Sequence, residues 1–501
     1  MCEIEQQTRS APTAGEARFG HKGLLIDGKF VASVSGETFE TRNPADNELL
    51  ATVSMGNAQD IDLAVAAANR ALAGEWGRMK PADRQRILLK LADLVEENFE
   101  EIAMLDTLDM GAPISLTRGR KQRAVGQLRY YAGLAATIHG DTMQNSMPGE
   151  YFSYTVKEPI GVVGSITPWN APLTSTIWKI GPILASGCAG VLKPAEQAPL
   201  TALRLGELML EAGLPAGVLN VVPGTGRIAG NALVEHRDVR KIAFTGSTGV
   251  GQEIVARARG TLKKVTLELG GKSPDIIFAD ADLAKAIPAA AMGVFVNSGQ
   301  ICSAGTRVLV ERSIYDEVVK GMSAFAKTLK VGFGTDPETQ IGPLVSAQQL
   351  ERVAKYADIG KAEGATTAVG GNRILTDGLN DGYFFEPTVF ANVTNNMAIA
   401  KEEIFGPVAS IIPFDTEEEA VQVANDSEYG LGAGVWTTNA ARAHRVSHNI
   451  ESGIVWVNCY GLLDAAVPFG GYKMSGYGRE SGPHHLDEYL QVKSVVMNIA
   501  K

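Results

Sequence analysis

The stretch Ile160-Gly-Val-Val-Gly-Ser-Ile166 begins a repeating pattern that decides the fold. It is a short apolar run that ends in a polar turn, and a helical stretch follows it. Further runs of this kind lie at residues 190–192, 218–222, 241–244 and 264–268. Short buried strands that alternate with helices are typical of βαβ units, in which the strands form a parallel sheet between helices. The sequence therefore predicts an α/β domain.

A second series of apolar runs follows the first, at residues 275–278, 306–310, 408–414 and 453–457. Two α/β domains explain the two series better than one large domain does. The boundary between them falls near Gly270-Gly271, because glycines separate the last run of one series from the first run of the other. We therefore predict two doubly wound parallel-sheet domains.

Segments outside both series have other patterns. Residues 1–20 lack periodicity and are predicted to form a loose tail. Residues 58–72 and 81–108 have apolar side chains three or four positions apart, so we predict amphipathic helices there. Residues 151–156 and 488–496 are rich in β-forming side chains, and they pair either with each other or with another subunit.

The composition excludes several classes of protein. The chain has 501 residues, of which 45% are hydrophobic and 20% charged, as expected of a globular protein with two or three domains. Its formal net charge of -10 argues against nucleic acid or an anionic membrane surface as the main partner. No apolar run is long enough to cross a bilayer, and the N-terminus lacks a signal-peptide pattern.

The four cysteines are Cys2, Cys188, Cys302 and Cys459, and they are well separated. None forms a C-x-x-C pair or lies near a histidine cluster, so we predict no metal site. Separated thiols in a large chain indicate a reducing compartment, and we expect the protein in the cytoplasm.

Cys302 is the candidate nucleophile. It lies in the small, Gly- and Ser-flanked segment 295–305, and Glu268 lies upstream in Leu267-Glu-Leu-Gly-Gly271. A thiol together with a carboxylate suggests covalent catalysis, in which one group attacks and the other transfers protons. The alternatives are that Cys302 is a small buried hydrophobic residue and that Glu268 faces solvent from a strand.

Two glycine-rich segments and one charged turn are candidate cofactor contacts. Residues 244–251 follow a strand and precede a helix predicted at 252–258, and residues 224–230 form a second such turn. Glycines at the start of a helix let the backbone approach a phosphate, although a plain tight turn explains either motif equally well. Glu196, in Lys193-Pro-Ala-Glu196, is placed to accept hydrogen bonds from a ribose and to disfavour a 2′-phosphate; alternatively, it lies in the first turn of a helix.

Taken together, seven motifs resemble the aldehyde dehydrogenase superfamily from about residue 20 to the C-terminus, specifically its NAD-dependent, hydrolytic, non-CoA-acylating branch. The motifs are Thr167-Pro-Trp-Asn170, Lys193-Pro-Ala-Glu196, Phe244-Thr-Gly-Ser247, Leu267-Glu-Leu-Gly-Gly-Lys-Ser-Pro274, the Cys302 segment, Glu402-Glu-Ile-Phe-Gly-Pro407 and Pro468-Phe-Gly-Gly-Tyr-Lys-Met-Ser-Gly476.

The resemblance implies a division of the chain. It implies a Rossmann-like NAD-binding domain at residues 21–142 and 160–271 and a catalytic domain at 272–473. Residues 143–159 and 474–501 then form a small β arm that bridges subunits, so we expect a homo-oligomer, either a dimer or a tetramer.

The resemblance also implies catalytic roles. Cys302 is expected to attack the aldehyde carbon, and Glu268 to activate the water that releases the acyl group as an acid. Asn170, unless it merely forms a turn, is expected to hold the oxyanion, a contribution typically worth about 3–4 kcal/mol. Lys179 and Glu480 are expected to form a buried pair linked to Glu268, or else a purely structural ion pair.

The NAD contacts implied by the resemblance lie on both sides of Cys302. On the adenosine and phosphate side they are Ile166, Trp169, Lys193, Glu196, Gly226, Gly230, Phe244, Gly246, Ser247 and Val250. Around the nicotinamide and its ribose they are Leu269, Gly270, Glu403 and Phe405. The remaining predicted contacts are Thr167, Pro168, Asn170, Thr245, Glu268 and Cys302.

The substrate funnel is the least determined part of the site. By resemblance it is lined by Arg123, Ala171, Trp178, Ile301, Ser303, Leu463 and Phe469. Ala171 and Leu463 stand where many relatives carry aromatic side chains, which favours larger apolar or aromatic aldehydes. The basic run 118–123 is interpreted as a solvated helix face, with the alternative that Arg123 guides a carboxylate-bearing semialdehyde.

Two other functions remain as alternatives. A CoA-acylating relative transfers the acyl group to CoA, but Glu268 argues against it, because a hydrolytic base is unhelpful when CoA must react. A non-catalytic NAD-binding scaffold is expected to lack Cys302 or Glu268, and this chain has both.

Overall fold

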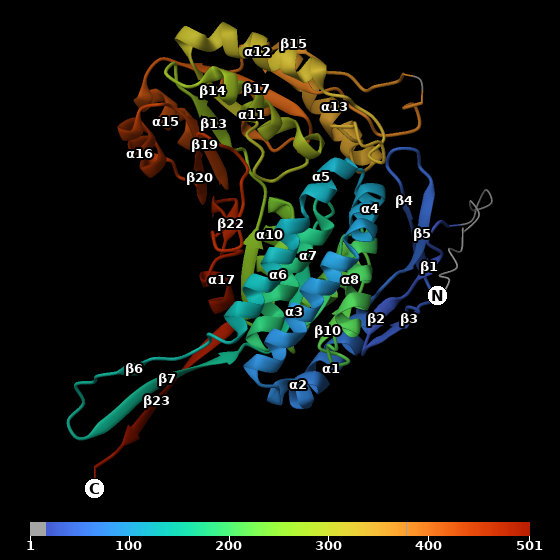
Figure 1. The fold of residues 1–501 in the computed structure, drawn as a ribbon, viewed down its shortest axis with the longest axis vertical. Helices are drawn as coiled ribbons and strands as arrows, with labels where there is room; N and C mark the ends of the chain where they lie inside the picture. Colours follow the sequence, from blue (N-terminus) through green and yellow to red (C-terminus); the bar gives the residue numbers. More distant parts are fainter. Residues whose placement is uncertain (1–16, 377, 501) are drawn as a thin grey trace, which may run out of the picture.

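The structure, a computed structural model, describes residues 17–376 and 378–500. Two large sheets, each flanked by helices, form the body of the molecule, and a long β arm extends away from it (Figure 1). The predicted α/β class is confirmed. The predicted loose tail lies, for residues 1–16, outside the described residues. Among the described helices, none combines the length and apolar character needed to cross a bilayer.

The first sheet has eight strands in the order β22-β12-β11-β8-β9-β10-β2-β3. Its five central strands are parallel and match the first series of apolar runs. They are β8 (Val162–Ile166), β9 (Ala189–Lys193), β10 (Leu219–Val221), β11 (Val239–Thr245) and β12 (Lys264–Glu268). Antiparallel strands complete both edges: β2 (Leu24–Ile26), β3 (Lys29–Val31) and β22 (Gly476–Tyr477).

Successive residues of these strands point to opposite faces, so the sheet has a hydrophobic core on each side. Val163 belongs to one core and its neighbour Val162 to the other. The helices of the first core are α3 (Pro81–Glu97), α4 (Phe99–Met110), α6 (Lys121–Ala135), α7 (Pro172–Ser186) and α8 (Leu200–Glu211). Those of the second are α1 (Ala58–Ala73), α9 (Asn231–Glu235) and α10 (Thr248–Ala258).

One helix prediction needs correction. Residues 81–108 form two helices, α3 and α4, which meet at Asn98. The Asn98 backbone has φ -97° and ψ 17°, outside the α-helical region, and its Nδ2 donates to the Leu94 carbonyl at 2.8 Å. The side chain thus satisfies a carbonyl at the end of α3, so the helix ends there although the apolar periodicity continues.

The second sheet has seven strands in the order β15-β16-β17-β14-β13-β19-β20. The strands are β13 (Pro274–Ile277), β14 (Arg307–Glu311), β15 (Thr366–Val369), β16 (Thr388–Ala391), β17 (Val408–Phe414), β19 (Gly432–Trp436) and β20 (Ile454–Val457). Its main helices are α11 (Leu283–Phe295), α12 (Tyr315–Thr328), α13 (Ala347–Ala362), α15 (Glu417–Asn425) and α16 (Ala440–Asn449). The chain passes from the first sheet to the second between Glu268 and Pro274.

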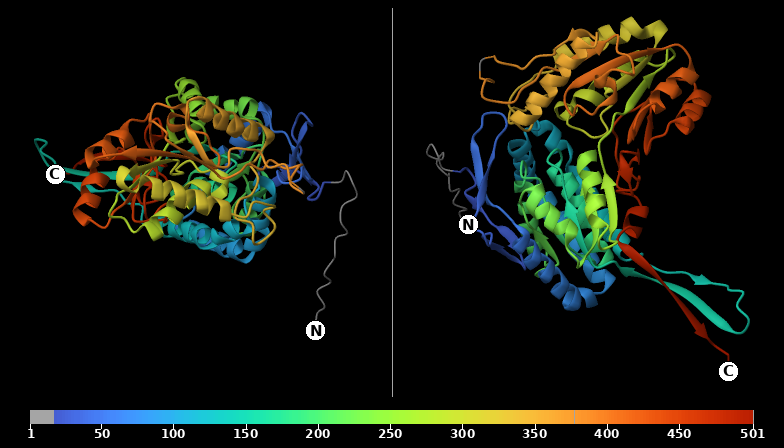
Figure 2. Two further views of the ribbon diagram at one scale, coloured as in Figure 1. Left: turned by 90° about the horizontal axis from the view of Figure 1, so that it is seen from above. Right: turned by 180° about the vertical axis from the view of Figure 1, so that it is seen from behind.

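The two β-rich stretches outside the series pair with each other. Strands β7 (Tyr151–Pro159) and β23 (Leu490–Asn498) are antiparallel along their whole length, and β6 (Thr142–Met143) adds a third strand. This arm projects from the body in both views of Figure 2 and leaves apolar side chains such as Phe152 and Val492 exposed. The predicted division of the chain into functional domains stays a prediction.

Short elements complete the described fold. A small sheet consists of β1 (His21–Lys22), β4 (Thr38–Arg42) and β5 (Leu49–Ser54). Further strands are β18 (Tyr429–Gly430) and β21 (Tyr472–Lys473). Further helices are α2 (Glu75–Arg78), α5 (Ile114–Gly119), α14 (Ala398–Lys401) and α17 (His484–Asp487), with single turns at Gly226–Gly230, Val296–Gly299 and Arg312–Ile314.

Candidate active site

The candidate residues gather at the carboxyl edge of the first sheet. Glu268 ends β12 and is paired in register with Thr245 at the end of β11. Ile166 ends β8 and is in register with Lys193 at the end of β9. In open α/β sheets, ligands bind beyond the carboxyl ends of the strands. The topology therefore places these predicted contacts along one edge, which faces the second sheet.

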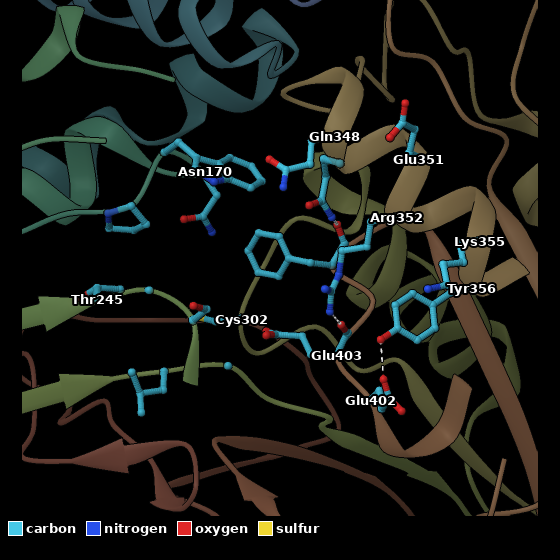
Figure 3. A pocket seen from close by; sticks show the side chains of 18 of the residues that line it. Asn170, Thr245, Cys302, Gln348, Glu351, Arg352, Lys355, Tyr356, Glu402 and Glu403 are labelled. Carbon is cyan, nitrogen blue, oxygen red and sulfur yellow. Dashed lines mark hydrogen bonds between the residues drawn. The ribbon is translucent and has the colours of Figure 1, made fainter. Parts of the chain in front are cut away.

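A pocket of about 810 Å³ lies at this edge (Figure 3). It brings together predicted residues from five separate segments of the chain: Pro168, Trp169, Asn170, Thr245, Gly246, Ser247, Glu268, Leu269, Gly270, Cys302, Glu403 and Phe405. Other predicted cofactor residues do not line it: Ile166, Thr167, Lys193, Glu196, Gly226, Gly230, Phe244 and Val250.

A left-handed turn positions Cys302. Asn297, Ser298 and Gly299, which follow helix α11, have φ values of 55°, 56° and 71°. At Gly299 a Cβ atom would lie 2.0 Å from the Gly406 carbonyl oxygen, so only glycine fits. Left-handed non-glycine residues are uncommon, and here they direct the chain so that the partly exposed Cys302 lines the pocket.

The Asn170 side chain is fixed against the Cys302 segment. Its Nδ2 donates to the Gln300 backbone carbonyl at 2.9 Å, and the Asn170 backbone carbonyl accepts from Asn297 Nδ2 at 3.1 Å. Gln300 is held in turn, because its Oε1 accepts from the Val345 backbone N–H at 3.0 Å. An amide nitrogen carries two hydrogens, and only one is used in this contact. Asn170 therefore lies beside Cys302 with a donor to spare.

Glu268 is buried, with 5% of its surface exposed, so the interpretation as a solvent-facing strand residue is wrong. Its Oε2 has no hydrogen-bond partner among the described residues. Burial, and then the charge of Glu480, raise the pKa of Glu268 well above its usual value, while Lys179 and Arg479 lower it. Lys179 and Glu480 form the expected buried ion pair. A carboxyl group with a raised pKa is suited to accept a proton near neutral pH.

The surroundings of Cys302 favour the protonated thiol. Burial, followed by the negative charges of Glu403, Glu268 and Glu480, raises its pKa to about 12, and a hydrogen bond from Ser303 only partly offsets them. Because the thiolate is the attacking form, the resting site needs a base or a change in charge before attack.

Replacing Glu403 with glutamine is expected to make Cys302 more reactive. Glu403 is the first of the charges that raise the Cys302 pKa, and a neutral amide lowers that pKa and increases the thiolate fraction. We expect iodoacetamide to alkylate Cys302 about threefold to tenfold faster in the cofactor-free variant at about pH 9. Mass spectrometry of the Cys302 peptide measures this rate. Glu402→Gln is the matched control, and equal rates in the two variants would contradict the assignment.

Helix α13 holds the Glu403–Phe405 loop in place. Gln349 Nε2 donates to the Phe405 carbonyl at 2.8 Å, and Arg352 donates to the carbonyls of Ile404 and Glu403. These bonds support Phe405 in a left-handed conformation with φ 62°, in which its ring meets Trp169 edge to face at 5.3 Å. Glu403 Oε1 accepts from the Gly271 backbone N–H at 3.2 Å and so links the loop to the end of the first sheet.

Sequence reasoning missed the contribution of α13 to the pocket. The pocket-lining residues of this helix are Gln348, Gln349, Glu351, Arg352, Lys355, Tyr356 and Ile359. The available signal was a stripe of polar side chains at helical spacing after Ser346, whose side chain caps the helix. Such a stripe is usually a solvated face, and only the packing of α13 against the loop reveals its role.

The glycine-rich segment 244–251 opens a helix directly. Helix α10 begins at Thr248, four residues before the predicted start, so Gly249 and Gly251 lie inside it. A Cβ on Gly251 would lie 2.7 Å from a Leu269 methyl group, which explains a glycine there. The N-terminus of α10 follows Gly246 and Ser247, both of which line the pocket. Free backbone N–H groups at a helix start attract phosphate.

Lys193 and Glu196 form the second candidate cofactor contact. Helix α8 begins only at Leu200, so the interpretation that places Glu196 in a first helical turn is wrong. Glu196 lies instead in a turn after β9, where its carboxylate accepts from Lys193 Nζ at 3.3 Å. Gly230 lies beside Lys193 in the Gly226–Gly230 turn. The carboxylate is partly exposed.

Three of the predicted funnel residues, Trp178, Leu463 and Phe469, pack together beside Cys302. Trp178, Leu431 and Phe469 form a small apolar cluster against which Cys302 and Leu463 pack. The rings of Trp178 and Phe469 lie 5.6 Å apart. Of the other predicted residues, Ala171 immediately precedes α7, Ile301 and Ser303 flank Cys302, and Arg123 lies over Trp178 at 5.4 Å.

The interpretation of residues 118–123 as a solvated face is wrong for part of the run. Arg118 is exposed and paired with Glu100. Arg120 turns inward to the buried Asp106, with 3.6 Å between their nitrogen and oxygen atoms. Arg123 packs on Trp178. Helix geometry explains the difference, because residues two or five positions apart point in different directions.

Comparison with known proteins agrees with this arrangement. The family model described as "Aldehyde dehydrogenase family" matches residues 30–495. A putative aldehyde dehydrogenase, DhaS, of Bacillus subtilis is 54% identical over 96% of each chain. The NAD+ complex of an aldehyde dehydrogenase from Bacillus cereus has a TM-score of 0.94 and 50% identity, covering 96% of this chain and 97% of that one. A betaine aldehyde dehydrogenase from Staphylococcus aureus in complex with NAD+ has a TM-score of 0.94 and 41% identity, with 95% of each chain covered.

Proposed function

The chain belongs to the aldehyde dehydrogenase family, and from this membership we propose that it oxidises an aldehyde to the carboxylic acid with NAD as hydride acceptor. The observation that carries the proposal is the convergence of Cys302, Asn170 and Glu268 on one pocket from distant parts of the chain. A nucleophile, an oxyanion donor and a base of raised pKa are the groups that acyl-enzyme chemistry requires.

The residues at the sheet edge fit a dinucleotide. The start of α10 offers backbone N–H groups to the phosphates, and Glu196 offers a carboxylate to a ribose. At Gly270 a Cβ would lie 2.2 Å from Glu403 Oε2, so the absence of a side chain there lets Glu403 lie against the strand end beside the thiol. The Bacillus cereus relative binds NAD+. Bound NAD supplies the acceptor for the hydride that leaves the aldehyde carbon.

The chain's own groups carry out the remaining steps. The Cys302 sulfur bonds to the aldehyde carbon, the thiol proton leaves to a base, and Asn170 stabilises the oxyanion of the thiohemiacetal. Loss of hydride leaves a thioester on Cys302. Glu268 then accepts a proton from water, the hydroxide adds to the thioester carbon, and the C–S bond breaks. The products are the carboxylic acid and a regenerated thiol, and Lys179 and Glu480 set the charge around Glu268.

Glu268 also supports hydrolysis over transfer to CoA. A buried carboxyl group with a raised pKa is poised to activate water, and a CoA-acylating enzyme gains nothing from such a base. Formation of free acid from aldehyde and NAD in the absence of CoA tests this part of the proposal. If the reaction requires CoA, the protein is a CoA-acylating dehydrogenase. If the protein binds NAD but oxidises no aldehyde, it is a non-catalytic NAD-binding scaffold.

The apolar walls of the proposed funnel favour larger apolar or aromatic aldehydes as substrates. Trp178 and Phe469 form one wall beside Cys302, while Ala171 and Leu463 carry no aromatic ring that narrows the path. Faster oxidation of benzaldehyde than of acetaldehyde is the expected result, measured as kcat/KM with NAD.

Replacing Glu196 with threonine is expected to relax the choice of cofactor. The Glu196 carboxylate repels a 2′-phosphate, so its removal raises the kcat/KM ratio of NADP to NAD by about tenfold. The exposed neighbour Gln197, changed to threonine, is the matched control. An unchanged ratio in the Glu196 variant would mean that the carboxylate does not select the cofactor and serves only in its ion pair with Lys193.

The arm supports a homo-oligomer, a dimer or a tetramer. Strand β23 is one of the two edge strands of its sheet and carries exposed apolar residues, among them Val492 and Val496. An exposed apolar edge favours pairing with another chain. Analytical ultracentrifugation of the whole protein distinguishes dimer from tetramer. The NAD-binding, catalytic and bridging segments, and a cytoplasmic location, remain predictions.

A further inference from the structure

Arg123 differs from the other arginines near it. Each of its neighbours meets a carboxylate: Arg118 meets Glu100 at 2.8 Å, Arg120 meets Asp106 at 3.6 Å, and Arg129 meets Asp93 at 3.1 Å and Glu96 at 2.7 Å. Arg123 makes no ion pair with any residue in the described part of the chain, and its Nε, shielded from solvent, has no acceptor there. The side chain as a whole is partly exposed, and an arginine that no carboxylate of the described residues neutralises can bind a negatively charged ligand.

The surroundings of Arg123 keep it charged. The guanidinium lies over the Trp178 ring, 5.4 Å from its centre, a distance at which a ring attracts a cation. Burial, followed by the charge of Arg120, lowers the pKa of Arg123 only to about 10, so the group is protonated at neutral pH. The charge of the neighbouring Arg120 is paired with the buried Asp106, so Arg123 is the arginine that presents an unpaired positive charge beside Trp178.

Trp178 provides a second, independent sign of a missing acceptor. The side chain is only 8% exposed, and its Nε1–H has no partner among the described residues. Buried donors nearly always find an acceptor, so an unpaired indole N–H is unusual. The same ring packs against Phe469 and belongs to the cluster that touches Cys302. The unpaired donors and the nucleophile are thus joined by one apolar wall.

We propose that Arg123 and Trp178 bind a carboxylate at the end of the substrate opposite its aldehyde group. This inference rests on the proposed function and names its substrate class: aldehyde acids whose two groups are separated by an aromatic ring or a short alkyl chain. The spacer lies along Trp178 and Phe469, and the aldehyde carbon reaches Cys302. The carboxylate accepts hydrogen bonds from the guanidinium, a geometry that arginine and carboxylate favour.

The proposal also predicts what the site rejects. A permanently cationic aldehyde whose charged end reaches Arg123 meets a like charge, and like charges repel. The Staphylococcus aureus relative is a betaine aldehyde dehydrogenase, so betaine aldehyde is a suitable cationic probe. This chain is expected to use betaine aldehyde poorly in spite of the common fold.

Four probes and three variants test the proposal. The probes are 4-carboxybenzaldehyde, its neutral methyl ester, benzaldehyde and betaine aldehyde, each assayed as kcat/KM with NAD. The variants are Arg123→Met, which keeps an unbranched side chain without charge, Arg123→Lys, which keeps the charge, and Arg129→Met, which removes an exposed arginine of the same helix. Ratios of kcat/KM within one protein cancel differences in the amount of folded enzyme.

The kcat/KM of the wild type is expected to be about tenfold or more higher for the carboxylate than for the ester, because one charge-assisted hydrogen bond contributes a difference of that size. Arg123→Met should lose this preference and gain on betaine aldehyde, Arg123→Lys should keep part of it, and Arg129→Met should keep all of it. Equal use of acid and ester by the wild type, or a preference that survives Arg123→Met, overturns the inference while benzaldehyde oxidation upholds the proposed function. Failure to oxidise any probe overturns both.

Discussion

Cys302→Ala is expected to reduce aldehyde-dependent NADH formation by at least about a thousandfold, the scale of losing a covalent nucleophile. Hydride leaves only from the tetrahedral adduct, and without the sulfur no adduct forms. The pocket itself depends on the left-handed turn and on Asn170 rather than on the thiol, so binding of NAD should persist. Absorbance of NADH and titration calorimetry with NAD measure the two properties.

Cys459 provides a control for the loss of a thiol. It is a free cysteine, partly exposed, that does not line the pocket. Cys459→Ala is expected to retain the wild-type rate. Residual turnover in Cys302→Ala near that of Cys459→Ala would remove Cys302 from the mechanism.

Glu268→Gln is expected to separate the two halves of the reaction. Attack by Cys302 and loss of hydride need no hydroxide, so one equivalent of NADH should form rapidly per active site. Release of the acid needs an activated water, which a neutral amide cannot provide, so the steady rate should fall by about a hundredfold or more. Stopped-flow absorbance records both phases. An unchanged steady rate contradicts the role of base, whereas loss of the burst places Glu268 in the first step.

The steady rate should also depend on pH through Glu268. Burial and Glu480 raise its pKa, so the basic form is lost as pH falls at a higher pH than for an ordinary carboxyl group. We therefore expect kcat to rise with pH through this raised pKa when deacylation limits turnover. The profile should flatten in Glu268→Gln, because the titrating group is absent.

The sequence predicts the framework well, because strand signals are local. All five runs of the first series and all four of the second are strands, and 151–156 pairs with 488–496. The sequence did not predict strand β19, because its glycine-rich beginning, Gly432-Ala-Gly434, lacks the usual β-forming residues. The sequence also did not predict the break between α3 and α4 at Asn98, because a side-chain hydrogen bond causes it and apolar periodicity carries no information about such bonds.

The site was only partly predictable, for a different physical reason. Motifs identify residues such as Cys302 and Glu268, but they do not show what surrounds them. The hydrogen bonds by which helix α13 holds the loop at Phe405 join segments more than 50 residues apart. Arg123 looked like part of a solvated run, and its packing on Trp178 appears only when α6 and α7 lie side by side.

Trapping the acyl-enzyme tests the central claim most directly. Glu268→Gln mixed with benzaldehyde and NAD, quenched in acid and digested, is expected to carry one benzoyl group on the peptide that contains Cys302, as mass spectrometry shows. The label should form at the rate of the NADH burst and be absent from Cys302→Ala. NADH formation with an unmodified Cys302 peptide, or with the acyl group on another residue, would contradict the account.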